Sequence, residues 1–246
     1  MNLERSLQIN KQFSSFFKET LSRTAPVKDY VHSRLDPKVT SAFNIGFCDN
    51  KILDFVKENG FTEEELSRIG LISFDEDGDY YPVFLNRIVI PIFTSYGIVG
   101  FSGRCYYQSQ QKYINTKKTL LYNKSDLLYP LAFSKKHIAQ AGYCIVVEGY
   151  FDALALISNG FKNVVALCGT SLSLSQINQI KRWTGAVRLL LDGDDAGNAA
   201  SLKIHDSLLE KRLDSGIIRL PEGFDPDTFI KEYGSGELTT LFAESI

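Results

Sequence analysis

Three aspartates follow an apolar run in the segment LLLDGDDAG, which spans residues 189–197. One glycine separates Asp192 from Asp194, and Asp195 follows directly. Carboxylate oxygens are the ligands that a hard divalent cation such as Mg²⁺ prefers. Asp195 is instead expected to open a helix, where a negative charge interacts favourably with the helix dipole. Asp192 and Asp194 are therefore candidate metal ligands.

Two further segments supply carboxylates in the same way. Glu148 follows the apolar run CIVV, and Asp225 and Asp227 follow the apolar run IIRL after a short turn. Asp152 lies four residues after Glu148, so one turn of helix would bring it to the same place. In a parallel sheet, ligands bind at the edge where the carboxyl ends of the strands meet. The sequence therefore predicts that these acids gather at one edge of a sheet.

Such a cluster needs a compensating charge. Two carboxylates about 4 Å apart repel each other by roughly 4 kcal/mol at an effective dielectric constant near 20. Neither the DGDDAG segment nor the EGYFD segment contains a Lys or Arg, so a divalent cation is the simplest counter-charge. Gly193 and Gly149 are expected to let the backbone turn sharply beside the acids. The alternative is that the acids are ordinary loop residues and helix caps. This alternative could account for any one acid, but it accounts less well for Glu148, Asp192 and Asp194 together.

The elements that must position these acids alternate in type from about residue 141 onward. The runs CIVV, VVALC, AVRLLL and IIRL read as strands, and the segments between them read as helices. Gly160 is expected to end the first of these helices, and Ser173 with Gln176 fits a capping box for the second. Strands alternating with helices predict a mostly parallel sheet.

The first 135 residues follow a different pattern. The first 70 residues or so read as helices, with a capping box from Thr62 to Glu65 and a stop at Gly70. The segments RIVIPIF and GIVGFSGRCYY then predict two strands joined in a hairpin by TSYG, and QKYINT predicts a further short strand. Arg104 and Lys112 supply positive charge for phosphates in this region, next to aromatic residues.

Composition sets broad limits. The 246-residue chain carries 27 basic and 29 acidic residues, a net charge of −2, which argues against a coat of basic charge for nucleic acid. No apolar run approaches the ~20 residues needed to span a bilayer, and the first residues lack a signal peptide, so we expect a cytoplasmic location. The cysteines, which form no CxxC pair, are expected to be buried apolar residues rather than zinc ligands. They are Cys48, Cys105, Cys144 and Cys168.

The acidic motifs resemble those of a known domain. VVEGYFDALAL, LLLDGDDAG and LPEGFDPDTF are similar to the motifs of the Toprim domain, which primases, topoisomerases and some nucleases share. The resemblance implies that Glu148, Asp192 and Asp194 are catalytic and hold two or more Mg²⁺ or Mn²⁺ ions. It implies that Asp225 and Asp227 are nearby metal or triphosphate ligands and that Asp152 gives outer support.

The upstream segments resemble the bacterial-type, DnaG-like primases in particular. RIVIPI, GFSGR, KYINT and LLYPL occur in the order found in that family's RNA-polymerase core, and YVHSRLDPKVTSAFNIGF resembles its opening segment. The resemblance covers about residues 7–235. It implies that template and nucleotide are bound by a set of basic, aromatic and amide side chains. These are Arg34, Arg87, Arg104, Lys112, Tyr113 and Asn115.

The resemblance implies an α/β fold, in which an α+β subdomain at 1–135 precedes a Toprim subdomain with a Rossmann-like parallel sheet at 136–246. It implies a metal-dependent nucleotidyltransferase, a DNA-directed RNA polymerase that makes short primers during DNA replication. The implied partners are single-stranded DNA, ribonucleoside triphosphates and a replicative helicase; no membrane partner is expected. A Toprim nuclease, a topoisomerase-like fragment and a non-catalytic single-stranded-DNA-binding module remain alternatives.

The chain also departs from the family. It contains no cysteine and histidine set for a zinc-binding domain, so no zinc is expected in this chain and such a domain would be supplied by another chain or a missing part. Little follows the Toprim motifs, so an excised core and a compact primase of a phage or mobile element are both expected origins.

Overall fold

The chain divides into two compact units in this computed structural model, which describes residues 2–107, 111–167, 169 and 171–244. The first unit comprises residues 1–33 and 37–124, and the second comprises residues 34–36 and 125–246. The predicted α/β fold class is confirmed, because one sheet is antiparallel and another is parallel. The division into subdomains at 135 and 136 stays a prediction.

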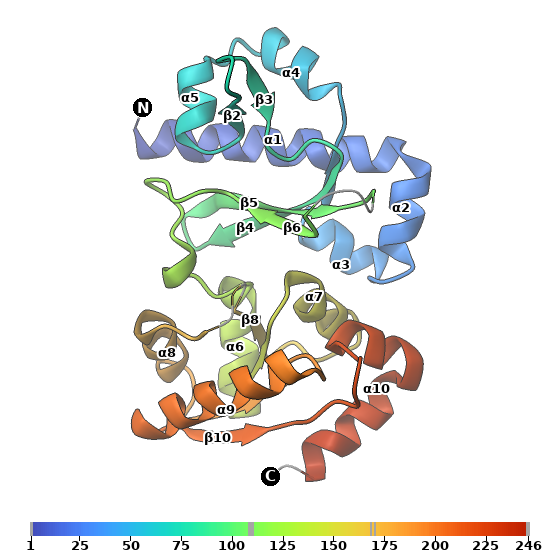
Figure 1. Cartoon of the computed structure of the whole chain (residues 1–246), viewed down its shortest axis with the longest axis vertical. Coiled ribbons are helices and arrows are strands. Elements are labelled where there is room, and N and C mark those ends of the chain that lie inside the picture. Colours follow the sequence, from blue (N-terminus) through green and yellow to red (C-terminus); the bar gives the residue numbers. More distant parts are fainter. Residues whose placement is uncertain (1, 108–110, 168, 170, 245–246) are drawn as a thin grey trace. The chain divides into compact units, whose positions relative to one another are not determined.

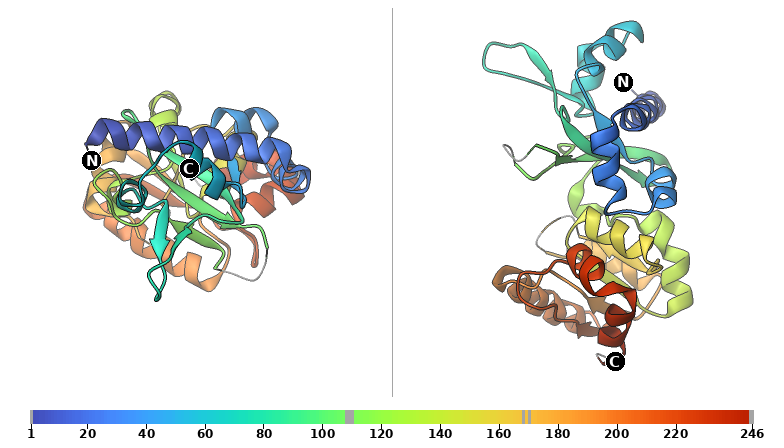
Figure 2. Two further views of the ribbon diagram at one scale, coloured as in Figure 1. Left: turned by 90° about the horizontal axis from the view of Figure 1, so that it is seen from above. Right: turned by 90° about the vertical axis from the view of Figure 1, so that its right-hand side faces the viewer.

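The first unit is built on a four-stranded antiparallel sheet in the order β1-β4-β5-β6, with a separate β2–β3 hairpin. That hairpin projects away from the rest of the unit (Figure 2). The elements of the unit, in chain order, are α1 (Leu3–Arg23), α2 (Ala25–His32), α3 (Pro37–Ala42), β1 (Gly46–Cys48), α4 (Ile52–Glu58), α5 (Glu63–Arg68), β2 (Ile72–Phe74), β3 (Tyr80–Pro82), β4 (Arg87–Thr94), β5 (Gly97–Cys105), β6 (Tyr113–Asn115) and a 3₁₀ turn at Lys124–Asp126 that continues into the second unit.

Helix α1 lies along one face of the antiparallel sheet (Figure 1). Phe13 and Phe17 are fully buried on this helix. The ring of Phe17 packs edge-on against that of Phe101 on β5, with 5.5 Å between the ring centres. Gly46 permits the close approach, since a Cβ there would lie 2.5 Å from the backbone of Phe17. The predicted β4–β5 hairpin and the predicted capping box at Thr62 are both confirmed.

The second unit is built on a parallel sheet in the order β10-β9-β7-β8. Helices surround this sheet, and α7 packs against α10 (Figure 1). The elements are α6 (Leu131–Ala141), β7 (Cys144–Val147), α7 (Tyr150–Ser158), β8 (Val164–Ala166), α8 (Leu174–Lys181), β9 (Ala186–Leu189), α9 (Asp195–Glu210), β10 (Asp214–Ile217) and α10 (Pro226–Glu244), which is kinked at Gly234.

Both faces of the parallel sheet are covered, which explains why its inner strand β7 is continuously apolar. The other inner strand, β9, is apolar apart from Arg188. All four residues of β7 are buried. Cys144 and Val146 belong to a core shared with α6, α8 and α9, and the alternate residues Ile145 and Val147 point to the opposite face. The predicted helix ending at Gly160 and the predicted capping box at Ser173 are confirmed.

One predicted strand is misplaced. The fourth strand was expected at IIRL, residues 217–220, but β10 covers Asp214–Ile217. β10 is an edge strand whose residues are exposed or half-buried, so it carries little of the apolar signal on which the prediction relied. Ile218 and Leu220 are buried beyond the last ladder pair, where the backbone N–H of Ile218 still donates to Leu189 O at 2.8 Å. The apolar run therefore marks burial rather than the strand itself.

Among the described residues, no helix is both long enough and apolar enough to cross a bilayer.

Candidate functional site

The carboxyl ends of β7 and β9 bring two predicted site residues together. Glu148 directly follows β7, and Asp192 comes three residues after β9. The two strands are neighbours, and the backbone N–H of Asp192 donates to Glu148 Oε1 at 3.2 Å. The prediction that acids from separate segments share one edge of the sheet is thus met for this pair.

Two glycines shape the loop after β9 by allowing close packing. A Cβ on Gly193 would lie 2.3 Å from Pro221 O, and a Cβ on Gly197 would lie 2.2 Å from Asp192 O. The N–H of Gly193 also donates to Phe224 O at 2.7 Å. Gly193 was expected to serve a sharp turn, but what requires glycine here is the contact with the 220–224 segment.

Asp194 is the N-cap of α9, a role that the sequence analysis gave to Asp195. Its Oδ1 accepts from the N–H of Gly197 at 2.7 Å, whereas Asp195 is exposed in the first turn of the helix. The cap bond ends on one oxygen of the carboxylate, and a carboxylate has two. Asp194 can therefore cap the helix and still present an oxygen at the strand ends.

Asp192 is a strongly perturbed acid at this edge. Its pKa is raised to about 7, first by burial and then by the nearby charges of Asp152, Glu148, Asp225 and Asp194, in that order. Its Oδ1 is buried, and no described group forms a hydrogen bond with it. A buried acceptor without a donor is costly, so this oxygen is suited to a cation.

Glu148 experiences the same environment more weakly. Burial raises its pKa, the N–H of Asp192 lowers it, and the charge of Asp194 raises it, for a net increase. An acid next to other acids in a partly buried site is harder to ionise in the absence of a counter-charge.

A divalent cation fits the donor set at this edge, although the side chains are not gathered into a finished site. The groups are all carboxylates, the hard oxygen ligands of Mg²⁺ and Mn²⁺, and one buried oxygen lacks a donor. Among the described residues, however, no group of three or more His, Cys, Asp or Glu side chains is arranged to hold a metal ion. The metal-ligand roles of the predicted acids therefore stay predictions.

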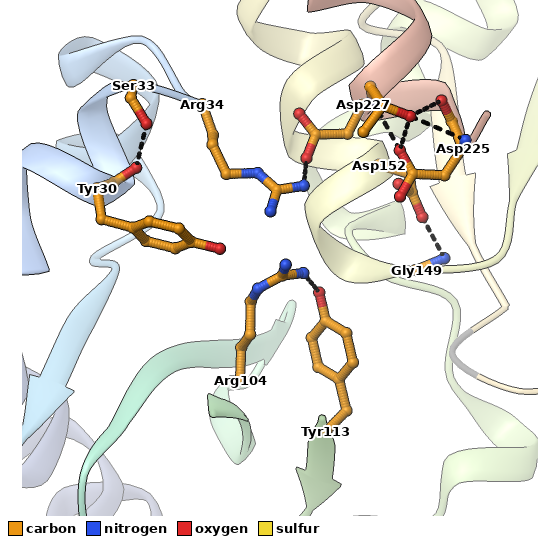
Figure 3. A network of polar contacts seen from close by, with 10 residues as sticks. Tyr30, Ser33, Arg34, Arg104, Tyr113, Gly149, Asp152, Asp225 and Asp227 are labelled. Atoms are coloured by element: carbon orange, nitrogen blue, oxygen red, sulfur yellow. Dashed lines mark hydrogen bonds and ion pairs between the residues drawn. The ribbon is translucent and has the colours of Figure 1, made fainter. Parts of the chain in front are cut away.

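Asp152 and Asp225 each satisfy local backbone groups. Asp152 is buried in the first turn of α7, and its Oδ2 accepts from the N–H of Gly149 at 2.9 Å (Figure 3). Asp225 precedes α10, and its Oδ1 accepts from the N–H and the hydroxyl of Thr228, both at 2.7 Å. These bonds fix where the two carboxylates lie near Asp192.

Asp227 and Arg34 form an ion pair with each other within the second unit (Figure 3). Their side chains are only 3% and 14% exposed. The sequence analysis placed Asp227 among the metal or triphosphate ligands and Arg34 among the template-binding residues, and no signal in the sequence paired them. They lie 193 positions apart, so only the fold brings them together.

In the first unit, Arg104 lies among tyrosines. Its Nη1 donates to the hydroxyl of Tyr113 at 2.5 Å, and its guanidinium lies 5.3 Å from the centre of that ring (Figure 3). Burial lowers the pKa of Arg104, but the charges of Tyr113 and Tyr30 and hydrogen bonds with both outweigh it and raise the pKa. Tyr30 was missed from the sequence because it lies on α2, far from the motif that contains Arg104.

Arg87 and Asn115 line a cavity of about 490 Å³ in the first unit. The Arg87 side chain is buried, and its Nη1 donates to Gln111 O at 2.8 Å. Lys112 is exposed next to β6. The cavity is mixed in character, with apolar walls, one exposed tyrosine and two cations. Its lining residues are Gly70, Ile72, Ser73, Tyr81, Pro82, Val83, Leu85, Arg87, Ile114, Asn115 and Lys117.

The cysteines are only partly as expected. Cys48 and Cys144 are buried, and burial raises the pKa of both thiols. Cys105 is half-buried, so its predicted full burial is wrong; it ends β5, where the strand reaches the surface. Cys168 lies outside the described residues.

Comparison with known proteins gives two family matches. Residues 16–135 match the family described as "DNA primase catalytic core, N-terminal domain", and residues 145–230 match the family described as "Toprim-like". Among curated relatives, a DNA primase of Aquifex aeolicus is 39% identical over 94% of this chain and 47% of its own length. A DNA primase of Clostridium acetobutylicum is 33% identical over 99% of this chain and 41% of its own length. The chain thus spans less than half the length of these relatives.

Solved structures agree over nearly the whole chain. The zinc-binding and RNA polymerase domains of the Aquifex aeolicus primase superpose with a TM-score of 0.91 at 35% identity, covering all of this chain and 62% of that one. The RNA polymerase domain of the Mycobacterium tuberculosis primase superposes with a TM-score of 0.86 at 31% identity, covering 98% of this chain and 84% of that one. A DnaG primase catalytic domain bound to single-stranded DNA superposes with a TM-score of 0.86 at 27% identity, covering 99% of this chain and 80% of that one.

Proposed function

Because this chain belongs to the bacterial-type DNA primase family, we propose that it carries the RNA-polymerase activity of a primase and makes short RNA primers on single-stranded DNA. In this reaction the 3′-hydroxyl of one ribonucleotide attacks the α-phosphate of a second. A new phosphodiester bond forms, the bond to the β-phosphate breaks, and pyrophosphate leaves.

The observation that carries the proposal is the environment of Asp192. Four other carboxylates act on this half-buried group, and its buried Oδ1 has no donor among the described residues. Such an arrangement is unfavourable by itself and becomes favourable with a cation present. We therefore assign Glu148, Asp192 and Asp194 as the catalytic carboxylates that would hold Mg²⁺ or Mn²⁺.

The surrounding acids support this set. Asp225 would lie close enough to contribute an oxygen, and Asp152 holds the first turn of α7 in place behind Glu148. When bound here, the divalent ions would neutralise charge on the phosphates and lower the pKa of the attacking hydroxyl. Glu148 also accepts the N–H of Asp192, which orients the loop that carries both aspartates.

The cations of the first unit have a complementary role in the proposal. Arg104 and Lys112 would bind phosphates of template or nucleotide, with Tyr113 keeping the Arg104 guanidinium in place. Arg87 and Asn115 line a cavity large enough for a planar group, and they would contact template or nucleotide there.

The wider setting of the reaction is also a proposal. A cytoplasmic location, ribonucleoside triphosphates as substrates and a replicative helicase as partner follow from the family. A zinc-binding domain, present in the Aquifex aeolicus structure, would act from another chain or another part of the protein.

The direct test replaces Asp192 and Asp194 by asparagine, singly and together. Asparagine retains an N-cap oxygen at position 194, so the helix keeps its cap while the charge is lost. We expect no RNA product from ribonucleotides on single-stranded templates and unchanged DNA affinity. Asp195→Asn, on an exposed neighbour, is the matched control and should remain active. RNA synthesis by the double variant would refute the assignment, and shortened DNA in the same gel would indicate a nuclease.

A further inference from the structure

The segment from Arg34 to Asp36 belongs to the second compact unit, although residues of the first unit flank it on both sides. Contacts of Arg34 and Asp36 anchor it there. Arg34 forms an ion pair with Asp227, and the backbone N–H of Asp36 donates to Ser158 Oγ at 3.1 Å. The segment therefore packs as a structural part of the second unit.

The surroundings of Arg34 suit a fixed guanidinium. Its side chain is 14% exposed, and its Cζ lies 5.3 Å from the centre of the Phe151 ring. A planar guanidinium can stack on an aromatic face while it donates to a carboxylate, and the ammonium of lysine cannot do both in the same way. The Asp227 side chain, at 3% exposure, is almost fully enclosed.

Asp227 lies in the first turn of α10, two residues after Asp225. The carboxylate of Asp225 caps the same turn through Thr228, so the position of Asp227 and that of Asp225 are mechanically linked. A buried, paired charge at Asp227 would hold the start of α10, and with it Asp225, at the acidic edge of the sheet.

We propose that Arg34 and Asp227 are positioning residues for each other and for Asp225, in place of separate roles in binding template and metal. The positioning role rests on the proposed function, because the place of Asp225 is important only if Asp225 contributes to the metal site. The ion pair itself is independent of that function.

The first experiment measures thermal unfolding in EDTA for Arg34→Gln, Asp227→Asn and the double variant. Removing one partner leaves a buried charge unpaired, so Arg34→Gln should lower the melting temperature by roughly 5–15 °C. Adding Asp227→Asn removes the unpaired charge and should recover at least half of that loss. Additive losses, or no loss in Arg34→Gln, would overturn the proposal.

The second experiment tests by Mn²⁺ calorimetry whether Arg34 and Asp227 position the metal site or whether Asp227 is itself a metal ligand. It is carried out at a temperature where every variant is folded. Asp227→Asn should keep the Mn²⁺ dissociation constant within about 3-fold of the wild type, because asparagine can still accept from Arg34. Asp225→Asn should weaken Mn²⁺ binding about 10-fold, the lower end of the range for a lost metal-site partner. Arg34→Gln should weaken it severalfold, and that effect should vanish in the Asp225→Asn background. A loss in Asp227→Asn as large as that in Asp225→Asn would overturn the proposal.

The third measurement tests Arg34 against its template-binding role. Each phosphate contact to a single strand contributes about 0.7 to the slope of log affinity against log salt. We expect Arg34→Gln to leave this slope unchanged, and a decrease of about 0.7 would assign Arg34 to the template. The matched control is Arg188→Gln, which breaks the partly exposed Arg188–Asp214 pair at 2.9 Å in the same unit and should leave Mn²⁺ affinity unchanged. None of these readouts needs primer synthesis, so a wild-type protein without that activity would refute the proposed function and leave the ion pair testable.

Discussion

Asp192 is held where its own negative charge is unfavourable. Burial removes water from the carboxylate, and four neighbouring acids repel the charge that remains. The consequence is a group that stays protonated up to about pH 7 in the metal-free protein, well above its ordinary pKa of 3.8. Perturbed acids of this kind concentrate at functional sites.

The perturbed pKa predicts how the stability of the metal-free protein depends on pH. Below about pH 4, Asp192 is protonated in both the folded and the unfolded protein and does not reduce the free energy of unfolding. Between about pH 4 and 7 only the unfolded chain ionises, so the free energy of unfolding falls as pH rises and levels off above about 7. One pKa unit corresponds to about 1.4 kcal/mol, so the full effect is on the order of 4 kcal/mol.

Urea unfolding in EDTA at several pH values measures this effect. The wild type should lose stability relative to Asp192→Asn as pH rises from 5 to 8, since asparagine does not titrate. Parallel curves for the two proteins, or a wild type that gains on the variant toward pH 8, would contradict the pKa of Asp192.

What the sequence could predict at this scale was the kind of residue and its approximate place. The alternating pattern predicted that Glu148 and Asp192 lie at the carboxyl ends of parallel strands. It did not predict that β7 and β9 are neighbours, which the structure shows. The specific hydrogen bonds were beyond it. Asp194 and Asp195 are both acceptable caps, and only the path of the backbone selects Asp194. The Arg34–Asp227 pair depends on tertiary packing across most of the chain.

At the scale of elements, strongly periodic or continuously apolar segments were predictable and weakly patterned ones were not. The buried strand β7 and both capping boxes were predicted, because burial on two faces and reciprocal cap bonds leave clear residue patterns. The edge strand β10 was misplaced because pairing with β9, rather than apolar content, defines it. Helix α6 was missed, and it lacks a side-chain cap bond at its N-terminus.

The loop after β9 gives a prediction about packing between elements. A Cβ at Gly193 would lie 2.3 Å from Pro221 O, so Gly193→Ala must displace either the aspartate loop or the 220–224 segment. We expect a loss of about 1–3 kcal/mol in the free energy of unfolding, together with weaker Mn²⁺ binding. Gly185→Ala is the matched control, because a Cβ there meets nothing within 4 Å. Equal stability of the two variants would show that the contact does not constrain the loop.

At the scale of the whole molecule, each unit has its own buried core. Phe17 and Phe101 belong to the core of the first unit, and Val146 and Leu189 belong to that of the second. The change of pattern near residue 141 indicated two parts from the sequence. It could not indicate that residues 34–36 pack with the second unit, since three residues carry no periodicity.

The net charge of −2 conceals two opposite local charges. Acids gather at the strand ends of the second unit, and the exposed Lys112 and the half-buried Arg104 lie on the first. Affinity for single-stranded DNA should therefore come from a few local cations and not from the chain as a whole.

Lys112→Gln tests this charge distribution. If Lys112 binds a phosphate, its removal should reduce the slope of log affinity against log salt by about 0.7, because fewer counterions are released. Lys57→Gln removes the same charge from an exposed site on α4 and should leave the slope unchanged. Fluorescence anisotropy with a labelled oligonucleotide at several salt concentrations gives both slopes. Equal decreases would mean that total charge governs binding, and the phosphate-binding role of Lys112 would then fail.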